Sequence, residues 1–411
     1  MKTADLVLRN ARLAEHGPDA AFDIGIADGR IAAVAPRLDT AGPVKDVGGR
    51  LVVPGLVETH IHLDKTRIVD RCACVKGTLD EAIAEVSREK RLFTEEDVHA
   101  RASRTLEKCI AQGTQHVRTH VEVDPAIGLR GFHGVQRLAR DYRWAVDIET
   151  CVFAQEGLTN YPGVEELMRE ALGQGARAVG GAPYTDADPH GQIDRVFAMA
   201  RDFDVDVDFH LDLGNSAEHM DLAYVCDCAE RHGWQGRVAV GHVTKMSLLP
   251  GPEFDALARR VADAGVAVTV LPSTDLYLMG RGERHTAIRG VLAVHALLAH
   301  GANGSLATNN VMNPFTPYGD CSLVRMANLY ANVCHVAREQ DLAECLAMVT
   351  TRAARLMRIA DYGVAEGMAA DLVVLDAPTP ALAVAEIASP LWGWKRGRAS
   401  FSREPVQLHR P

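Results

Sequence analysis

The middle of the chain alternates short apolar segments with longer segments of helical periodicity. The apolar segments, which glycine, proline and polar residues bound, predict eight strands: Leu56–His62, Gln115–Val123, Trp144–Phe153, Ala176–Tyr184, Val205–Asp212, Arg237–Val243, Val266–Ser273 and Gly304–Asn310. Between them, the apolar spacing predicts helices that mostly end near a glycine: Thr78–Gln112, Val164–Gly173, Asn215–His232, Glu253–Gly265 and Ala287–His300. Eight strands alternating with helices over about 260 residues is the size of a closed (β/α)8 barrel.

Both ends of the chain show a different pattern, in which short strands are joined by turns. Asp28–Gly29 is a typical hairpin pair, and residues 370–375 near the other end have the same strand character. We therefore expect an α/β protein with two parts. Residues 1–55 and 361–411 form a small flanking β-sandwich domain, and residues 56–360 form a TIM-barrel catalytic domain.

Polar side chains gather at the ends of the predicted strands. In a barrel of this type the active site lies at the carboxyl ends of the strands. The residues found there, in chain order, are His60, His62, His120, Glu122, Gln155, His210, Asp212, His242, Asn309 and Asn310. The sequence thus predicts that one barrel mouth collects them.

The first strand carries the clearest metal-binding pattern. His60 and His62 are two residues apart on a strand, so they project to the same side of the sheet. With His210 on the fifth strand they form three neutral nitrogen ligands that could hold Zn²⁺ or Fe²⁺ and leave a position for water. Each histidine alone is more often structural, but the three together at strand ends predict one divalent metal ion.

Other residues at the mouth have two interpretations each. His242 could orient or deprotonate the bound water, or it could be a capped loop histidine. Gln155 offers an acceptor and two donors to the amide edge of a heterocycle, but it could also be a solvated loop residue. Lys65 and Arg67 could meet an anionic substrate, or pair with Asp64.

Composition narrows the class of partner and the compartment. The formal net charge is −10 without a long basic run, which argues against nucleic acid or an anionic membrane as a partner and favours a small molecule. No apolar run reaches membrane-spanning length, the start of the chain lacks the apolar stretch of a signal peptide, and the nine cysteines do not form a secreted-type framework. We expect a cytoplasmic homo-oligomer with reduced cysteines.

The chain resembles the cytosine deaminase branch of the amidohydrolase superfamily, which includes N-isopropylammelide isopropylaminohydrolase, over almost its whole length. The segments that carry the resemblance are Val53–Lys65, Val117–Val123, Phe153–Gly157, the strand ending in His210, Gly241–His242 and Asp361–Val364. The resemblance implies a TIM barrel with a flanking β-sandwich, one catalytic divalent ion, and hydrolytic removal of an amine from a nitrogen heterocycle. It also implies metal ligation by His60, His62 and His210, substrate contact by Gln155, and polarisation of hydroxide by His242. The mouth residues His120, Lys65, Arg67 and Asn310 are further substrate-binding candidates.

Two departures from the family pattern change the expected chemistry. Leu213 stands where cytosine deaminases carry a proton-shuttling Glu, and Asn309 stands where the family has a metal-binding Asp that accepts a proton. Asn310 and Asn313 are likewise amides in place of Asp. An amide oxygen can coordinate a metal, but Asn cannot accept a proton near pH 7. We therefore predict little cytosine deaminase activity.

The same departures predict which groups replace the missing carboxylates. With three neutral histidines around the ion, the proton of the bound water would pass to His242 or, as a weaker candidate, to Asp212. The lost negative charges favour an anionic ring as substrate, with Lys65 or Arg67 as counter-charge.

Three functions remain open at this point. The first is a metal-dependent hydrolase that acts on a C–N bond of a small cyclic amide or amidine. The second is a binding or assembly subunit that keeps the fold without catalysis, and the third is a lyase or isomerase that uses the same pocket.

Overall fold

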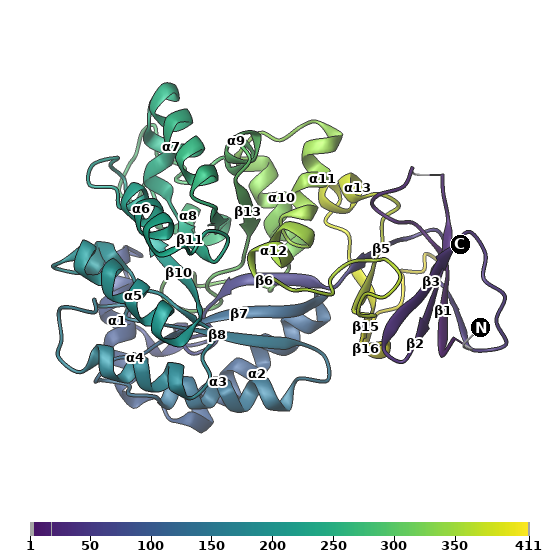
Figure 1. Ribbon diagram of the computed structural model, residues 1–411, viewed down its shortest axis with the longest axis horizontal. Coiled ribbons are helices and arrows are strands. Elements are labelled where there is room, and N and C mark those ends of the chain that lie inside the picture. Colours follow the sequence, from purple (N-terminus) through teal and green to yellow (C-terminus); the bar gives the residue numbers. More distant parts are fainter. Residues whose placement is uncertain (1–3, 18, 410–411) are drawn as a thin grey trace.

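The computed structural model describes residues 4–17 and 19–409, and it contains an eight-stranded parallel sheet (Figure 1). The strands lie in chain order: β6 (Leu56–Ile61), β7 (Thr114–Glu122), β8 (Asp147–Phe153), β9 (Ala178–Val179), β10 (Asp206–Leu211), β11 (Val238–His242), β12 (Val266–Val270) and β13 (Asn303–Leu306). A parallel bridge between Ile61 and Asn309 joins the chain beyond β13 to β6. The predicted (β/α)8 barrel is confirmed.

All eight predicted strands are present, but one is much shorter than predicted. Ala176–Tyr184 contains only the two-residue strand β9. The adjacent Gly180 explains why the chain comes so close to β10: a side chain there would meet the Asp208 carbonyl oxygen at 1.9 Å. Pro183 then begins a 3-10 turn, η3 (Pro183–Thr185), which places Tyr184 at the barrel mouth.

The long helix predicted over Thr78–Gln112 is wrong, because the structure divides it. It forms α1 (Leu79–Glu89), the 3-10 turn η2 (Lys90–Leu92) and α2 (Glu95–Ala111). The Lys90 side chain is buried against three carboxylates, and the Thr94 hydroxyl accepts a hydrogen bond from the Asp97 N–H to cap α2. Capping by Thr supplies a partner for an otherwise unpaired helix N–H group.

The remaining helices surround the barrel strands (Figure 1). They are α3 (Arg130–Asp141), α4 (Val164–Gly173), α5 (Pro189–Phe203), α6 (Leu222–His232), α7 (Gly251–Asp263), α8 (Pro272–Leu278), α9 (Val294–Ala299), α10 (Leu323–Val333), α11 (Glu339–Ala347), α12 (Thr351–Leu356) and α13 (Pro380–Ala385), with 3-10 turns η1 (Val69–Arg71) and η4 (Thr244–Leu248). The prediction for α4 matches its bounds, whereas α6 and α9 begin seven residues later than the predicted Asn215 and Ala287. Most of their buried faces pack with the outer faces of the strands in one apolar core, whereas α12 packs in a smaller cluster with Val57, Ala239 and Ala267.

Two four-stranded sheets flank the barrel at one end (Figure 1). One has the order β3-β2-β1-β4, from β1 (Leu6–Ala11), β2 (Phe22–Ala27), β3 (Arg30–Ala35) and β4 (Val44–Asp46), and the other has the order β16-β15-β14-β5, from β5 (Leu51–Pro54), β14 (Leu372–Leu375), β15 (Pro390–Lys395) and β16 (Arg398–Ser402). Side chains of both sheets, including Leu8, Ile24, Leu372 and Trp392, share a separate apolar core. The predicted flanking β-structure, built from both ends of the chain, is confirmed.

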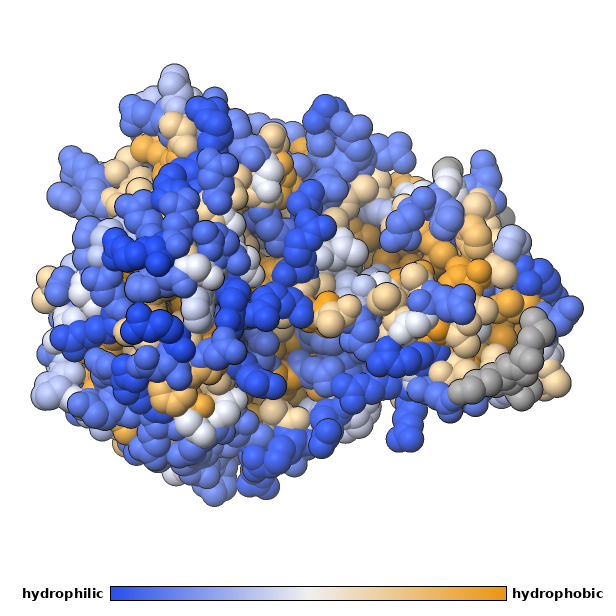
Figure 2. Space-filling view, viewed as in Figure 1, coloured by the Kyte–Doolittle hydropathy of each residue, from blue (hydrophilic) through white to orange (hydrophobic). Residues whose placement is uncertain are grey.

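The surface is mainly hydrophilic over the barrel helices, with more apolar colour over the flanking sheets (Figure 2). Among the described residues, no helix is both long and apolar enough to cross a membrane.

Candidate active site

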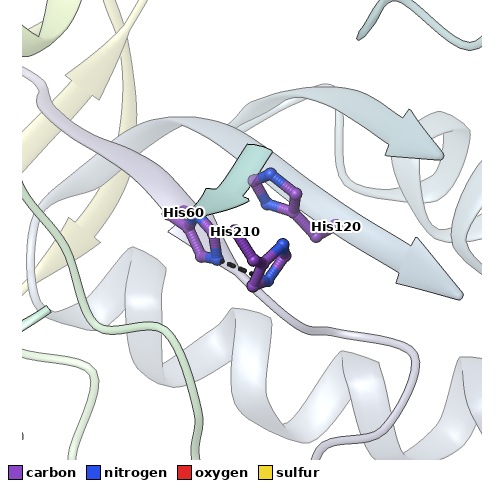
Figure 3. Close-up of side chains that lie close together, drawn as sticks. All are labelled: His60, His120 and His210. Atoms are coloured by element: carbon purple, nitrogen blue, oxygen red, sulfur yellow. Dashed lines mark hydrogen bonds between the residues drawn. The ribbon is translucent and has the colours of Figure 1, made fainter. Parts of the chain in front are cut away.

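Four histidines meet inside the carboxyl end of the barrel. His60 lies on β6, His120 on β7 and His210 on β10, and Figure 3 shows these three rings facing one another. His62 follows directly after β6. The Nε2 atom of His210 lies 3.0 Å from Nε2 of His60 and also 3.0 Å from Nε2 of His62.

The donor atoms of this cluster suit a divalent cation. Burial lowers the pKa of His60, His62 and His210 well below the usual value, and the neighbouring imidazoles lower it further. Neutral imidazole is the form that binds a metal. A separation of 3.0 Å between Nε2 atoms is compatible with a shared ion, since metal–nitrogen bonds are about 2.0–2.1 Å long. The residues present therefore fit the metal that the sequence predicts.

His120 takes a different place from the other three. Its ring stacks on His60 with the centroids 3.8 Å apart, and its Nε2 lies 3.5 Å from Asp208, whose carboxylate also accepts a hydrogen bond from Arg118. Ring nitrogens of His60, His120 and His210 do come within 4.8 Å of one another. The two contacts of 3.0 Å nevertheless join His210 to His60 and His62, and His120 takes part in neither.

A very small, partly open cavity of about 10 Å³ lies beside the histidines. Typical ligand pockets measure roughly 300–1,000 Å³, so this cavity has room for about one water molecule, and a ring enters only if side chains of the wall move. Its walls are formed by His62, Lys65, Leu79, Gln155, Tyr184, His210, Leu213, His242, Thr274, Leu278, Asn309, Asn310 and Phe315. None of these side chains carries a carboxylate.

Lys65 and Arg67 differ in position. The Lys65 ammonium is buried, pairs with Glu122 at 2.6 Å rather than with Asp64, and donates a hydrogen bond to the Gln155 side-chain oxygen at 3.2 Å. This contact fixes how Gln155 presents its amide group to the cavity. Arg67 instead donates to the Thr105 hydroxyl and is not part of the cavity wall.

The eighth strand ends in a chain of amides. The Asn313 side-chain amide donates to the Asn310 oxygen at 2.7 Å, and the Asn310 amide donates to the Asn309 oxygen at 2.8 Å. The Asn313 oxygen in turn accepts backbone N–H groups of Phe315 and Thr316. A carboxylate at 313 could not donate the first of these hydrogen bonds, so the amides at 309, 310 and 313 act together.

Asp212 is turned away from the cavity. Its carboxylate accepts the backbone N–H groups of Asp221 and Leu222 at the start of α6. This contact explains why α6 begins later than the sequence predicts, and it gives the carboxylate a structural role. Leu213, the next residue, does line the cavity and offers no titratable group there.

His242 has a partner that the sequence reasoning missed. Its Nδ1 lies 2.6 Å from an oxygen of Asp275, a fully buried carboxylate on α8. Burial raises the pKa of Asp275, and the hydrogen bond to His242 opposes this shift. The sequence did contain a sign of this partner. Asp275 follows soon after the predicted strand Val266–Ser273, just as the other mouth residues follow their strands.

Known proteins match the chain over nearly its full length. A family model described as "Amidohydrolase family" matches residues 131–401. The chain is 29% identical to N-isopropylammelide isopropyl amidohydrolase of Pseudomonas sp. (strain ADP), over 98% of this chain and 99% of that protein.

Two solved structures give the same picture. The crystal structure of 5-methylcytosine deaminase from Klebsiella pneumoniae liganded with 5-fluorocytosine has a TM-score of 0.93 at 30% identity, covering 98% of this chain and 99% of that chain. N-isopropylammelide isopropylaminohydrolase from Burkholderia multivorans has a TM-score of 0.84 at 30% identity, covering 97% and 98%.

Proposed function

The chain belongs to the amidohydrolase family, and from this premise we propose that it hydrolyses an exocyclic or ring C–N bond of a small nitrogen heterocycle with one bound divalent metal ion, Zn²⁺ or Fe²⁺. One observation carries the proposal. The Nε2 atoms of His60, His62 and His210 converge at 3.0 Å contacts next to a small cavity that Gln155 and His242 also line.

His60, His62 and His210 would hold the ion, with the Asn309 amide oxygen as a further neutral ligand. A divalent ion in such a site supplies Lewis acidity, which lowers the pKa of water and polarises the bond to be cleaved. Three neutral imidazoles leave most of the positive charge of the ion uncompensated. This charge replaces the activation that a carboxylate on the eighth strand would otherwise give.

Proton transfer is assigned to His242. Water forms a bond to the ring carbon through its oxygen while His242 takes one of its protons on Nε2. When the C–N bond breaks, the same imidazole returns that proton to the leaving nitrogen, so that the amine departs neutral. Leu213 cannot take part, and Asp212 is already engaged with two backbone N–H groups.

Substrate recognition is assigned to Gln155 together with Asn310. The Lys65 ammonium occupies one acceptor position of the Gln155 side-chain oxygen. The buried amide nitrogen of Gln155 lies near the Tyr184 hydroxyl but forms no well-aligned hydrogen bond with it. That nitrogen is therefore available to a ring carbonyl or ring nitrogen. A buried donor that only the correct ring satisfies gives strong discrimination between analogues.

Metal analysis combined with an amine-release assay tests the proposal. Protein purified without added metal is analysed for its metal content, and then tested with cytosine, 5-methylcytosine and N-isopropylammelide for release of ammonia or isopropylamine. We expect one ion per chain and turnover of at least one ring of this kind. Full metal occupancy without any turnover would favour the lyase or isomerase alternative, and a metal-free protein would favour the binding subunit.

The His60→Ala variant completes the test. It should lose both the ion and the activity, because it removes one of three ligands. His116→Ala is the matched control, since His116 is also buried on a barrel strand but contacts Asp147 and Asp371 at the other end of the barrel. Retention of the ion in the His60→Ala protein would remove the ligand assignment.

A further inference from the structure

His242, a histidine of the cavity wall, forms a buried pair with Asp275, a carboxylate that lies behind the wall. We infer that Asp275 is a positioning residue that holds His242 in a single tautomer and orientation, with Nε2 unprotonated and facing the cavity. This inference rests on the proposed function, in which His242 takes a proton from water. It assigns a role to a residue that the family resemblance did not single out.

The hydrogen bonds of Asp275 define the tautomer. One carboxylate oxygen lies 2.6 Å from His242 Nδ1, and the other accepts the backbone N–H of Leu271 at 3.2 Å. An ionised carboxylate only accepts hydrogen bonds, so the proton lies on Nδ1 and Nε2 keeps its lone pair. Both side chains are almost completely buried, at 2% and 0% exposure for the two residues, so water does not compete for this contact.

The backbone at His242 also directs the ring toward the cavity. β11 ends at His242, where φ is 72°, and Val243 follows with a φ of 50°. Left-handed conformations are uncommon for residues with a side chain and are strained for a β-branched residue such as valine. The strain turns the end of the strand so that the imidazole joins the wall that His210 and Asn309 form.

Two other buried acidic groups near the cavity are engaged elsewhere. Glu122 is paired with Lys65 and Lys90, Asp212 accepts two backbone N–H groups at α6, and the eighth strand supplies amides only. In the family pattern the carboxylate that assists proton transfer lies at the end of the eighth strand. In this chain the corresponding carboxylate is Asp275 on α8, and it acts through the imidazole of His242.

Nitrogen NMR of the histidine side chains tests the inference without a substrate or a metal. In metal-free protein labelled with ¹⁵N-histidine, we expect the His242 signals of the Nδ1–H tautomer, identified by their loss in His242→Gln. In Asp275→Asn those signals should shift toward the Nε2–H tautomer or a mixture, because an amide can donate to Nδ1. Asp186→Asn is the matched control: Asp186 is a partly buried carboxylate that accepts the backbone N–H groups of Leu158 and Thr159, and it does not line the cavity.

Kinetics give the second measurement. With whichever of cytosine, 5-methylcytosine and N-isopropylammelide the enzyme turns over, Asp275→Asn should lower kcat by about 10²–10⁴-fold, change KM little, and leave the metal content unchanged. An Nε2–H tautomer in the unmodified protein, or an Asp275→Asn variant with full kcat, would overturn the inference. If no ring is turned over, the proposed function fails, while the NMR result still decides the role of Asp275.

Discussion

Two clusters at opposite ends of the barrel contain residues that could ligate a metal, and one of them is partly exposed at Asp147. At the carboxyl end His60, His120 and His210 approach one another, and at the other end His116, Asp147 and Asp371 do so. In the second cluster, the ammonium of Lys395 lies 2.6 Å from Asp371 and 2.7 Å from Asp147. In the first, no lysine or arginine of the described chain is hydrogen-bonded to the imidazoles.

A third cluster follows the pattern of the second. Glu122, Asp124 and Glu156 lie together near the rim of the barrel, and the Lys90 ammonium contacts all three at 2.5–2.9 Å. The three clusters resemble one another in the metal-ligating types of side chain they contain and in the spacing of their ligand atoms. The clusters differ in whether a lysine ammonium of the chain neutralises them. The two clusters that contain carboxylates each have such an internal cation, Lys395 or Lys90. The imidazole cluster has none among the described residues, so it can bind a cation from solution.

The largest expected effect concerns metal content. His210→Ala should reduce the bound ion from one per chain to near zero and remove all measurable activity, because His210 Nε2 is the atom closest to both other ligands. His116→Ala should keep the full complement of metal. Elemental analysis of both variants, with circular dichroism as a check of folding, decides the result. Equal loss of metal in the two variants would mean that the comparison between the clusters is wrong.

Removal of the internal cation should have the next largest effect, on stability. Lys395→Met leaves Asp371 and Asp147 without their buried partner, and breaking such a pair typically costs about 3–5 kcal/mol in the free energy of unfolding. Urea unfolding at pH 7 measures it. Lys108→Met, at an exposed position of α2, should change the free energy by less than about 0.5 kcal/mol.

The pH dependence of this effect sharpens the prediction. Burial tends to raise the pKa of Asp371, but the His116 hydrogen bond and the Lys395 charge outweigh it and hold the pKa well below its usual value. A lowered pKa in the folded state contributes stability above the unfolded pKa of about 4, and this contribution is lost as the pH falls toward the folded value. The difference between the unmodified protein and Lys395→Met should therefore shrink below about pH 4. A difference that grows on acidification would contradict the assignment.

A smaller effect is expected in the reaction with cytosine. Leu213 and Asn309 lack the proton-transferring groups that the family pattern places at these positions, and loss of such a group typically costs about 10²–10⁴-fold in rate. Ammonia release from saturating cytosine should thus be far below the roughly 10 s⁻¹ of a median enzyme. Turnover at that level would show that His242 and Asp275 fully compensate for both changes.

The sequence predicted the barrel well because its strands are short, apolar and regularly spaced, and because catalytic residues follow strand ends. It failed where a tertiary contact decides local structure. The break between α1 and α2 depends on the burial of Lys90 by carboxylates of β7 and the loops beyond, and the late start of α6 depends on Asp212. Neither contact leaves a periodic signal.

The candidate site shows the same division. Positions at strand ends identified His62, Gln155, His210 and His242, all of which line the cavity. The sequence did not predict the direction in which side chains point. Arg67 points to Thr105, and Asp275 contacts His242 from α8, the helix that follows β12. The sequence also did not predict which residues form ion pairs, since Lys65 pairs with Glu122, 57 residues away.

The smallest effect concerns the charge of the substrate. Glu122 pairs with Lys65, which lines the cavity, and Arg67 lies outside the cavity wall, so the predicted preference for an anionic ring depends less on these two residues. The uncompensated charge of a metal held by neutral ligands remains, and it should favour an anionic ring over its neutral analogue by about tenfold, which corresponds to about 1.4 kcal/mol. Matched pairs of neutral and acidic pyrimidine-like rings, compared by kcat/KM, measure this preference. The double variant Lys65→Met/Glu122→Gln, which removes both charges of the pair, should leave the ratio within each pair unchanged. If the ratio falls in the double variant, the Lys65 ammonium contacts the substrate directly, and if the neutral ring is preferred throughout, the field of the metal is offset by a group other than those in the cavity wall.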